Sequence, residues 1–240
     1  MSTIEGVAVG ASRRAFAHGR RGLRALLAMA MPPVCCLCGA SGQAPALDLC
    51  DVCTTFLPVV EDESGLAPGI GSSTLLRTLF AFKYGWPVDQ FIRALKFRGD
   101  RVYARVLGEL IARAQLDSGA AMPACLVPMP LHASRYRERG FNQAAEIARY
   151  AGASLGVRVE SRVLVRSLAT QEQSGLSLED RRRNVRQAFE VVKPLPYGRI
   201  ALLDDVVTTG STAMAAIQAL TDAGAKEIEL WAAARAVKLM

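Results

Sequence analysis

The sequence predicts an α/β protein in which helices flank a parallel sheet, with a small cysteine-rich module near the N-terminal end. Over residues 79–240, short apolar runs of strand length alternate with amphipathic helical segments, which is typical of a parallel sheet covered on both faces. Five of the six cysteines lie within residues 35–53. We therefore expect a basic segment at 1–30, the cysteine module at 31–60, a linker at 61–78 and the α/β domain at 79–240.

The cysteine module contains two C-x-x-C pairs, Cys35 with Cys38 and Cys50 with Cys53. Two such pairs bind zinc tetrahedrally through four thiolates in zinc ribbons, and Gly39 permits the tight turn after the first pair. The spacer between the pairs is somewhat shorter than the common template. The pattern predicts a four-cysteine zinc site, with disulfide bonds as the alternative.

The other two cysteines are interpreted differently. Cys36 could replace Cys35 as a zinc ligand, although only Cys35 gives the two-residue spacing. Cys125 stands alone in an apolar run, so we expect a small buried hydrophobic residue and not a nucleophile.

Residues 1–31 carry arginines where a signal peptide would need a longer uninterrupted apolar core. We therefore expect a cytoplasmic protein, in which disulfide bonds are disfavoured. An arginine-rich, acid-poor mitochondrial transit peptide is the alternative. No apolar run approaches the roughly 18 residues of a transmembrane helix, so we expect no membrane span.

The formal net charge is +7, from 29 Lys and Arg against 22 Asp and Glu residues. Such an excess of positive charge indicates an anionic partner. The partner could be a phosphate-bearing small molecule or a nucleic acid, and net charge alone does not separate the two.

Hydrophobic periodicity, prolines and glycines predict the secondary structure of the α/β domain. Leu126–Leu131 is expected as a strand whose prolines favour an edge position or an irregular end. His132–Gly140 is expected as a polar loop. The remaining elements are strands at 79–84, 157–166, 188–192, 200–203 and 227–234, and helices at 87–99, at 101–116, from 142 onward and at 213–223.

The segment Arg199–Thr212 joins a strand to a polar loop. Ile200–Leu203 is a continuous apolar run, which suits a parallel strand buried on both faces. Asp204 and Asp205 follow at its carboxyl end, where open α/β sheets bind ligands. Thr208–Thr212 then offer hydroxyl and N–H donors before a helix whose N-terminus favours an anion. The segment predicts a site for sugar hydroxyls and a phosphate, with a diol or Mg²⁺ offsetting the repulsion between the two carboxylates.

Arginines gather in two further polar stretches. Arg135, Arg137 and Arg139 lie between a strand and a helix, where guanidinium groups can bind phosphate oxygens in pairs. A solvated basic loop is the alternative there. Residues 166–191 contain few large apolar residues, which is typical of a disordered segment or of a lid that orders over a ligand.

Four blocks of this sequence together resemble the competence protein F (ComF) family, in which a zinc ribbon precedes a type I phosphoribosyltransferase domain. The blocks are the paired C-x-x-C motifs, ALKFRGD at Ala94–Asp100, VPMPLHASRYRERGFNQA at Val127–Ala144 and DDVVTTGST at Asp204–Thr212. The last block resembles the loop of type I phosphoribosyltransferases that binds phosphoribosyl pyrophosphate (PRPP). The resemblance covers residues 30–236 and implies a type I phosphoribosyltransferase-like parallel sheet.

The resemblance also implies roles for single residues. Asp204 and Asp205 would hold the ribose diol of PRPP, and Mg²⁺ would bridge its diphosphate to the sugar. The residues that would cradle the 5′-phosphate are Thr208, Thr209, Gly210, Ser211 and Thr212. The pyrophosphate would face Pro128 and Met129, with Arg135 and Arg139 as partners, and Arg166, Thr170 and Gln173 would close over bound PRPP.

The implied activity is displacement of pyrophosphate by a nitrogen nucleophile, in DNA uptake, competence or nucleotide metabolism. The alternative is a non-catalytic protein that binds PRPP or nucleotides and holds single-stranded DNA in transformation or repair, together with competence or repair proteins. Purine salvage enzymes for 6-oxopurines carry an acid where Thr208 stands, so hypoxanthine and guanine are poor candidate acceptors. No free cysteine starts the chain, so glutamine hydrolysis is not expected.

Overall fold

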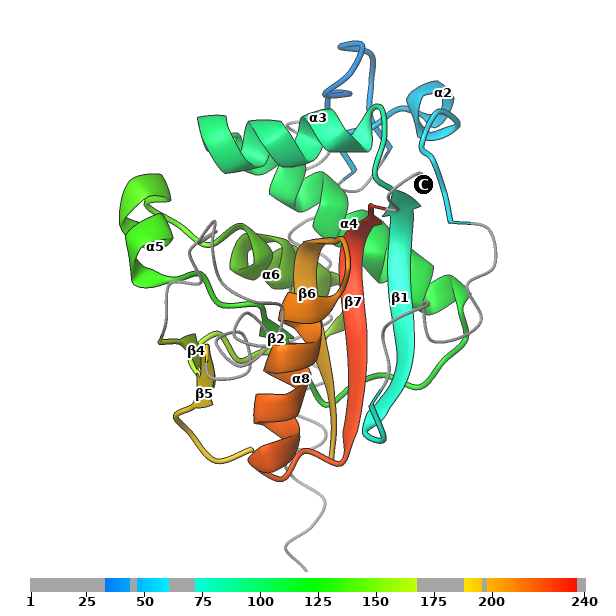
Figure 1. Ribbon diagram of the computed structural model, residues 1–240. Helices are drawn as coiled ribbons and strands as arrows, with labels where there is room; N and C mark the ends of the chain where they lie inside the picture. The colour runs from blue at the N-terminus through cyan, green and yellow to red at the C-terminus, as the bar shows by residue number, and fades with distance from the viewer. Residues whose placement is uncertain (1–32, 44–46, 61–71, 168–187, 196–197, 237–240) are drawn as a thin grey trace, which may run out of the picture. The chain divides into compact units, whose positions relative to one another are not determined.

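The computed structural model describes residues 33–43, 47–60, 72–167, 188–195 and 198–236 (Figure 1). The chain divides into two compact units, Met1–Thr55 and Phe56–Met240. The sequence placed the end of the cysteine module at residue 60. In the structure, Val59 forms an antiparallel bridge with Phe82, and the Lys83 N–H donates to the Pro58 carbonyl at 2.8 Å. These backbone contacts explain why the second unit begins earlier.

The first unit is built from loops and one turn of helix. Two antiparallel bridges, Val34 with Ser41 and Gln43 with Leu47, hold the loops. Helix α2, Asp51–Thr54, is the one helix in its described residues. Units of about this size gain only marginal stability from an apolar core, so a cross-link or a metal is expected to contribute to the stability of this one.

The second unit contains a five-stranded parallel sheet in the order β1-β7-β6-β2-β3. Most residues of β6 and β7 are buried, as continuous apolar runs require of strands covered on both faces. The helix-flanked parallel sheet predicted from the sequence is confirmed. Its strands are β1 Leu75–Lys83, β2 Cys125–Pro128, β3 Arg158–Val159, β6 Arg199–Val207 and β7 Glu227–Arg235.

Some strand predictions need correction. β2 lies between β6 and β3, so the edge position predicted from its prolines is wrong, and Pro128 instead gives the strand its irregular end. The single strand predicted for 157–166 is two strands. β3 joins the main sheet, whereas β4, Leu164–Arg166, pairs antiparallel with β5, Phe189–Val191. β1 begins at Leu75, inside the predicted linker.

Helices cover both faces of the sheet. α8, Ser211–Asp222, lies in front of it in Figure 1, whereas α4, Arg101–Asp117, and α6, Gln143–Leu155, lie behind. α4 and α6 approach closely at Gly108, where a Cβ would lie 2.7 Å from the Ile147 carbonyl oxygen. Among the described residues, no helix is long and apolar enough to cross a membrane.

Another helix lies over the carboxyl ends of the strands (Figure 1). It begins as α3, Val88–Arg93, and continues as the π-helical turn η1, Ala94–Arg98. Gly99 ends the helix with a φ of 72°, which is the C-terminal cap that the sequence predicts. The π-helical turn was not predicted, because a single wider turn leaves the apolar periodicity of the segment almost unchanged.

The predicted arginine loop is a helix, α5, Ala133–Arg139. His132 precedes it, and its Nδ1 accepts the Ser134 N–H at 3.2 Å. Gly140 ends the helix with a φ of 75°. The loop prediction was wrong because it relied on an apolar stripe, and this helix has no buried residue that would give one. A side-chain cap at its start and a left-handed glycine at its end define the helix instead.

A buried ion pair joins β1 to β7. Glu229 is 1% exposed, and its Oε2 lies 2.8 Å from an Arg77 nitrogen and accepts the Trp231 indole N–H at 2.9 Å. Arg77 also donates to Gln115 of α4. The network therefore connects two strands to the helix that covers them.

We expect Glu229→Ala to lower the free energy of unfolding by about 3 kcal/mol, because it leaves the Arg77 cation without its buried partner. Urea denaturation measures the change. The control is Arg135→Ala, which removes an ion pair with Glu138 whose side chains are 60% and 58% exposed. This control should change the free energy of unfolding by less than about 1 kcal/mol. Equal losses in the two variants would contradict the prediction.

Candidate functional site

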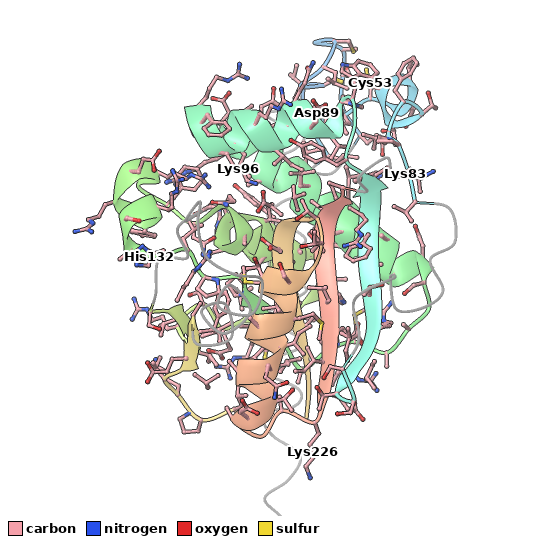
Figure 2. All side chains as sticks on the ribbon, in the orientation of Figure 1. Cys53, Lys83, Asp89, Lys96, His132 and Lys226 are labelled. Atoms are coloured by element: carbon pink, nitrogen blue, oxygen red, sulfur yellow. The ribbon has the colours of Figure 1, made fainter. Side chains whose placement is uncertain are left out.

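The two adjacent acids lie within β6 and not beyond its end. Val206 and Val207 continue the pairing with β7, so Asp204 and Asp205 occupy the carboxyl half of the strand. Asp205 is 4% exposed and forms an ion pair with Lys96 of η1, which Figure 2 shows below its helix, on the side of the strands. The Asp204 Oδ1 accepts the Asp205 N–H at 2.8 Å.

The charge of this pair of acids is only partly compensated. Burial and the negative charge of Asp205 raise the pKa of Asp204 well above its ordinary value, and Lys96 acts in the opposite direction. Burial lowers the pKa of the Arg166 guanidinium, and the negative charge of Asp204 opposes that shift. The structure therefore places Arg166 of β4 within electrostatic range of Asp204. A divalent cation or the hydroxyl donors of a diol would further stabilise the two carboxylates.

The loop after β6 presents hydroxyl groups beside the N-terminus of α8. Thr208, Thr209 and Ser211 are exposed, and the Thr209 and Ser211 hydroxyls lie 3.1 Å apart. Gly210 precedes the helix with a φ of 79° and has no side chain to cap it. Apart from a 3.5 Å contact of the Ser211 N–H with Thr209 Oγ1, the first-turn N–H groups, including that of Thr212, remain suited to an anion.

The end of β2 lies beside the acids. Pro128 pairs with Leu203, the residue before Asp204, and the Met129 N–H donates to the Leu203 carbonyl at 2.8 Å. Asn142, at the start of α6, donates from Nδ2 to the Met129 carbonyl at 2.9 Å. The structure thus brings Pro128 and Met129 next to the residues that the sequence assigned to the sugar.

The structure distinguishes two arginines that the sequence treated alike. Arg135 is on the exposed surface of α5 and pairs with Glu138 at 2.8 Å. Arg139 is partly buried, its guanidinium carbon lies 5.8 Å from the centre of the Phe97 ring, and its Nε is buried without a hydrogen-bond partner. Arg139 is therefore the better placed of the two to receive an anion.

A pocket of about 220 Å³ opens beside Arg139. Its lining is rich in cations and contains two aromatic rings. The sequence did not identify this pocket, because Lys96 and Arg98 end a helix, where the helix dipole alone explains their charge. The lining residues are Lys96, Phe97, Arg98, Gly99, Glu138, Arg139 and Phe141. Lys96 thus belongs both to the pocket and to the ion pair with Asp205.

Two residues of the predicted site, Thr170 and Gln173, lie outside the described residues. Their predicted closure over a ligand stays a prediction. Arg166, the third residue of that group, lies in β4 with its guanidinium carbon 5.5 Å from the centre of the Phe189 ring.

The four paired cysteines form a second site, in the first unit. The Sγ atoms of Cys35, Cys38, Cys50 and Cys53 all lie within 4.8 Å of one another. The Cys53 N–H donates to the Cys50 Sγ at 3.4 Å. All six cysteines lie in the described part of the chain and are free thiols, and four thiolates are the ligand set of structural zinc sites. The cluster therefore fits a zinc ion better than disulfide bonds.

Cys36 lies outside this cluster. Burial and the negative charges of Cys35 and Asp48 raise the pKa of the Cys36 thiol to about 12. Burial would also raise the pKa of Cys35, but hydrogen bonds from backbone N–H groups lower it to about 6. The Sγ of Cys35, and not that of Cys36, belongs to the cluster, so the geometry favours Cys35 over Cys36 as a ligand.

The sequence and the fold of this chain can be compared with those of known proteins. No protein-family model matches the sequence. Competence protein F of Haemophilus influenzae is 34% identical over 157 residues, which are 62% of this chain and 69% of that protein. DNA utilization protein YhgH of Escherichia coli strain K12 is 32% identical over 156 residues, 63% of this chain and 69% of that protein.

Among solved structures, a glutamine PRPP amidotransferase from B. subtilis is 20% identical, with a TM-score of 0.38, over 54% of this chain and 25% of that chain. The sequence identity to competence protein F extends over more than two thirds of that relative. This chain belongs to the competence protein F family.

Proposed function

We propose that this chain binds PRPP with Mg²⁺, transfers its phosphoribosyl group to a nitrogen acceptor, and acts in DNA uptake, competence or nucleotide metabolism. One observation carries the proposal. The incompletely compensated acids Asp204 and Asp205 lie between a loop of hydroxyl and N–H donors and a pocket lined by cations. A ligand with a diol, a phosphate and a diphosphate matches these three surroundings. The names of the relatives, a competence protein and a DNA utilization protein, support the cellular context.

Each part of PRPP has a proposed partner. Asp204 and Asp205 accept hydrogen bonds from the ribose hydroxyls, and Thr208–Thr212 donate to the 5′-phosphate. The diphosphate faces Pro128 and Met129, with Arg139 as its guanidinium partner. Carboxylate oxygens are the ligands that Mg²⁺ prefers in proteins, so the two acids fit it, and Mg²⁺ would supply positive charge to the diphosphate.

In the proposed reaction, a nitrogen atom of the acceptor bonds to the anomeric carbon while the bond from that carbon to the pyrophosphate oxygen breaks. Pyrophosphate leaves with the electron pair of the broken bond. The protein contributes by positioning the ribose and by placing cations where negative charge develops on the leaving group. Arg166 of β4 interacts electrostatically with Asp204, so it would add a further positive charge to the site.

Incubation with PRPP, Mg²⁺ and a panel of nitrogenous acceptors should release inorganic pyrophosphate with at least one acceptor. A coupled pyrophosphate assay measures the rate, and omission of the acceptor gives the background. Hypoxanthine and guanine should give no more than background, because Thr208 stands where an acid would assist a 6-oxopurine. If the protein binds PRPP tightly but releases no pyrophosphate above background with any acceptor, turnover is contradicted and the protein only binds PRPP.

A second candidate function is binding of single-stranded DNA. It is favoured by Phe97 and Tyr136, which are 74% and 52% exposed. Phe97 lies in η1 between Lys96 and Arg98, and Tyr136 lies in the arginine-rich helix α5. Exposed rings stack on bases while neighbouring cations contact the phosphates. Affinity for an oligonucleotide should then fall steeply as salt rises, whereas a flat salt response would exclude this function.

A further inference from the structure

Lys96 is held at a defined position by the π-helical turn η1. Ala94 and Leu95, in the same turn, are 4% and 0% exposed, so the turn is anchored to the core. Gly99 ends the turn in the left-handed region. The Lys96 side chain is 22% exposed, in contrast to its partner carboxylate of Asp205, which is 5% exposed. Lys96 thus reaches from a fixed turn toward the strand end, and π-helical turns of this kind occur frequently at functional sites.

Two surroundings compete for the Lys96 ammonium. One is the carboxylate of Asp205, with which it forms an ion pair. The other is the pocket of about 220 Å³, which Lys96 also lines. That volume is many times what a single water molecule needs, so the pocket has room for a diphosphate group. Lys96 therefore lies at the border between an acid and a site for an anion.

The pocket contains more positive than negative charge. Arg98 already pairs with Asp100 at 2.9 Å, and the two side chains are 66% and 42% exposed. Arg139 has a buried Nε without a hydrogen-bond partner, and Glu138 is the acidic residue of the lining. An entering anion would meet Arg139 directly, whereas the ammonium of Lys96 would have to turn away from Asp205 to bind it.

We propose that Lys96 is a positioning residue that exchanges partners, from Asp205 in the free protein to a diphosphate group bound in this pocket. The exchange releases Asp205 at the moment when a ribose diol or Mg²⁺ arrives to take the place of the ammonium. The part of the proposal that concerns ribose rests on the proposed function, whereas the exchange between a carboxylate and a diphosphate does not. The proposal makes Asp205 a competitor of any anion for Lys96.

Inorganic pyrophosphate, titrated into the full chain by calorimetry in buffer without Mg²⁺, tests the exchange. Lys96→Met should weaken pyrophosphate binding at least tenfold. Asp205→Asn should instead strengthen it about fivefold, because the competing carboxylate is gone. The control is Lys226→Met, which removes the same charge from an exposed lysine at the opposite end of the sheet (Figure 2) and should leave the affinity within twofold.

The double variant Lys96→Met with Asp205→Asn decides between exchange and a general effect of charge. It leaves no unpaired partner, so it should fold even if Lys96→Met alone does not. Under the proposal, the double variant binds pyrophosphate more weakly than Asp205→Asn does. It also binds no more tightly than Lys96→Met alone, so the fivefold gain from Asp205→Asn is absent when Lys96 is absent. A gain that persists without Lys96, or no gain in Asp205→Asn, would overturn the exchange.

A parallel titration with PRPP and Mg²⁺ separates this inference from the proposed function. If the protein fails to bind PRPP but shows the pyrophosphate pattern above, the exchange stands and the PRPP site is wrong. If the protein binds PRPP but Asp205→Asn shows no gain for pyrophosphate, the PRPP site stands and the exchange is wrong.

Discussion

Replacing both Asp204 and Asp205 with asparagine is expected to abolish PRPP binding while the α/β unit stays folded. In the proposed complex each carboxylate accepts hydrogen bonds from the ribose diol or binds Mg²⁺. Hydrogen bonds to charged groups contribute roughly 1.5–3 kcal/mol each, so losing both sets should weaken binding at least about a hundredfold. Asparagine keeps the size of the side chain and removes only its charge, which isolates the electrostatic role.

The raised pKa of Asp204 predicts the sign of its effect on stability. A carboxyl group whose pKa is higher in the folded than in the unfolded state favours folding at low pH, and this contribution is lost as pH rises through the folded-state pKa. Above the ordinary pKa of an aspartate, Asp204 therefore destabilises the free protein. Asp204→Asn alone should raise the free energy of unfolding at neutral pH while weakening PRPP binding.

Binding should depend on pH in the opposite direction. The complex requires ionised carboxylates, so PRPP affinity should fall as pH falls through the raised pKa of Asp204, at a higher pH than for an ordinary aspartate. Calorimetric titration with PRPP and Mg²⁺ measures the affinities, and thermal unfolding followed by circular dichroism checks the fold. Unchanged PRPP affinity in the folded double variant would show that the pocket lies elsewhere.

The second large effect is expected at the cysteine cluster. We propose that Cys35, Cys38, Cys50 and Cys53 hold one structural zinc ion, and that this ion stabilises the first unit. Binding energy in structural zinc sites is largely folding energy, because the preformed site does not exist in the unfolded chain. Cys38→Ser, which removes an exposed ligand and little packing, should therefore abolish stoichiometric zinc and unfold the first unit.

Metal analysis of protein purified without chelator measures the zinc, and proteolysis followed by mass spectrometry reports cleavage within residues 33–55. Wild-type protein should contain one zinc ion per chain. Cys36→Ser is the matched control, since Cys36 is a neighbouring cysteine outside the cluster, and its zinc content should equal that of the wild type. Wild-type protein without zinc would refute the four-thiolate site, and loss of zinc in Cys36→Ser would show that the ligand set is wrong.

Local sequence patterns predicted most strands of the sheet, but they did not predict the position of β2 within it or the short helix that follows β2. The apolar run at Ile200–Leu203 correctly indicated a buried parallel strand, because a strand covered on both faces needs apolar residues at every position. The prolines near Pro128 favoured an edge position, yet β2 is interior, because Pro128 is the last residue of the strand and pairs with β6 alone. His132–Gly140 lacked an apolar stripe and was predicted as a loop, whereas capping made it helical.

The sequence by itself determined which chemical groups this protein carries together. Two C-x-x-C pairs implied a cluster of thiols, and the acids at Asp204 and Asp205 before Thr208–Thr212 implied a site for a sugar and a phosphate. The thiol cluster is confirmed, whereas the site for a sugar and a phosphate stays a prediction. Each motif lies within one short segment, so chain connectivity alone keeps its residues close together.

Only the tertiary structure decided which distant groups meet at the site. It pairs Lys96 with Asp205, places Arg139 rather than Arg135 at the pocket, and brings Arg166 within range of Asp204. A single sequence does not encode such pairs in any local pattern, because an ion pair depends on where two separately folded segments lie in space. In the sequence, the helix dipole alone explains the positive charge of Lys96 at a helix end. The position of η1 over the end of β6 is what brings this lysine to Asp205.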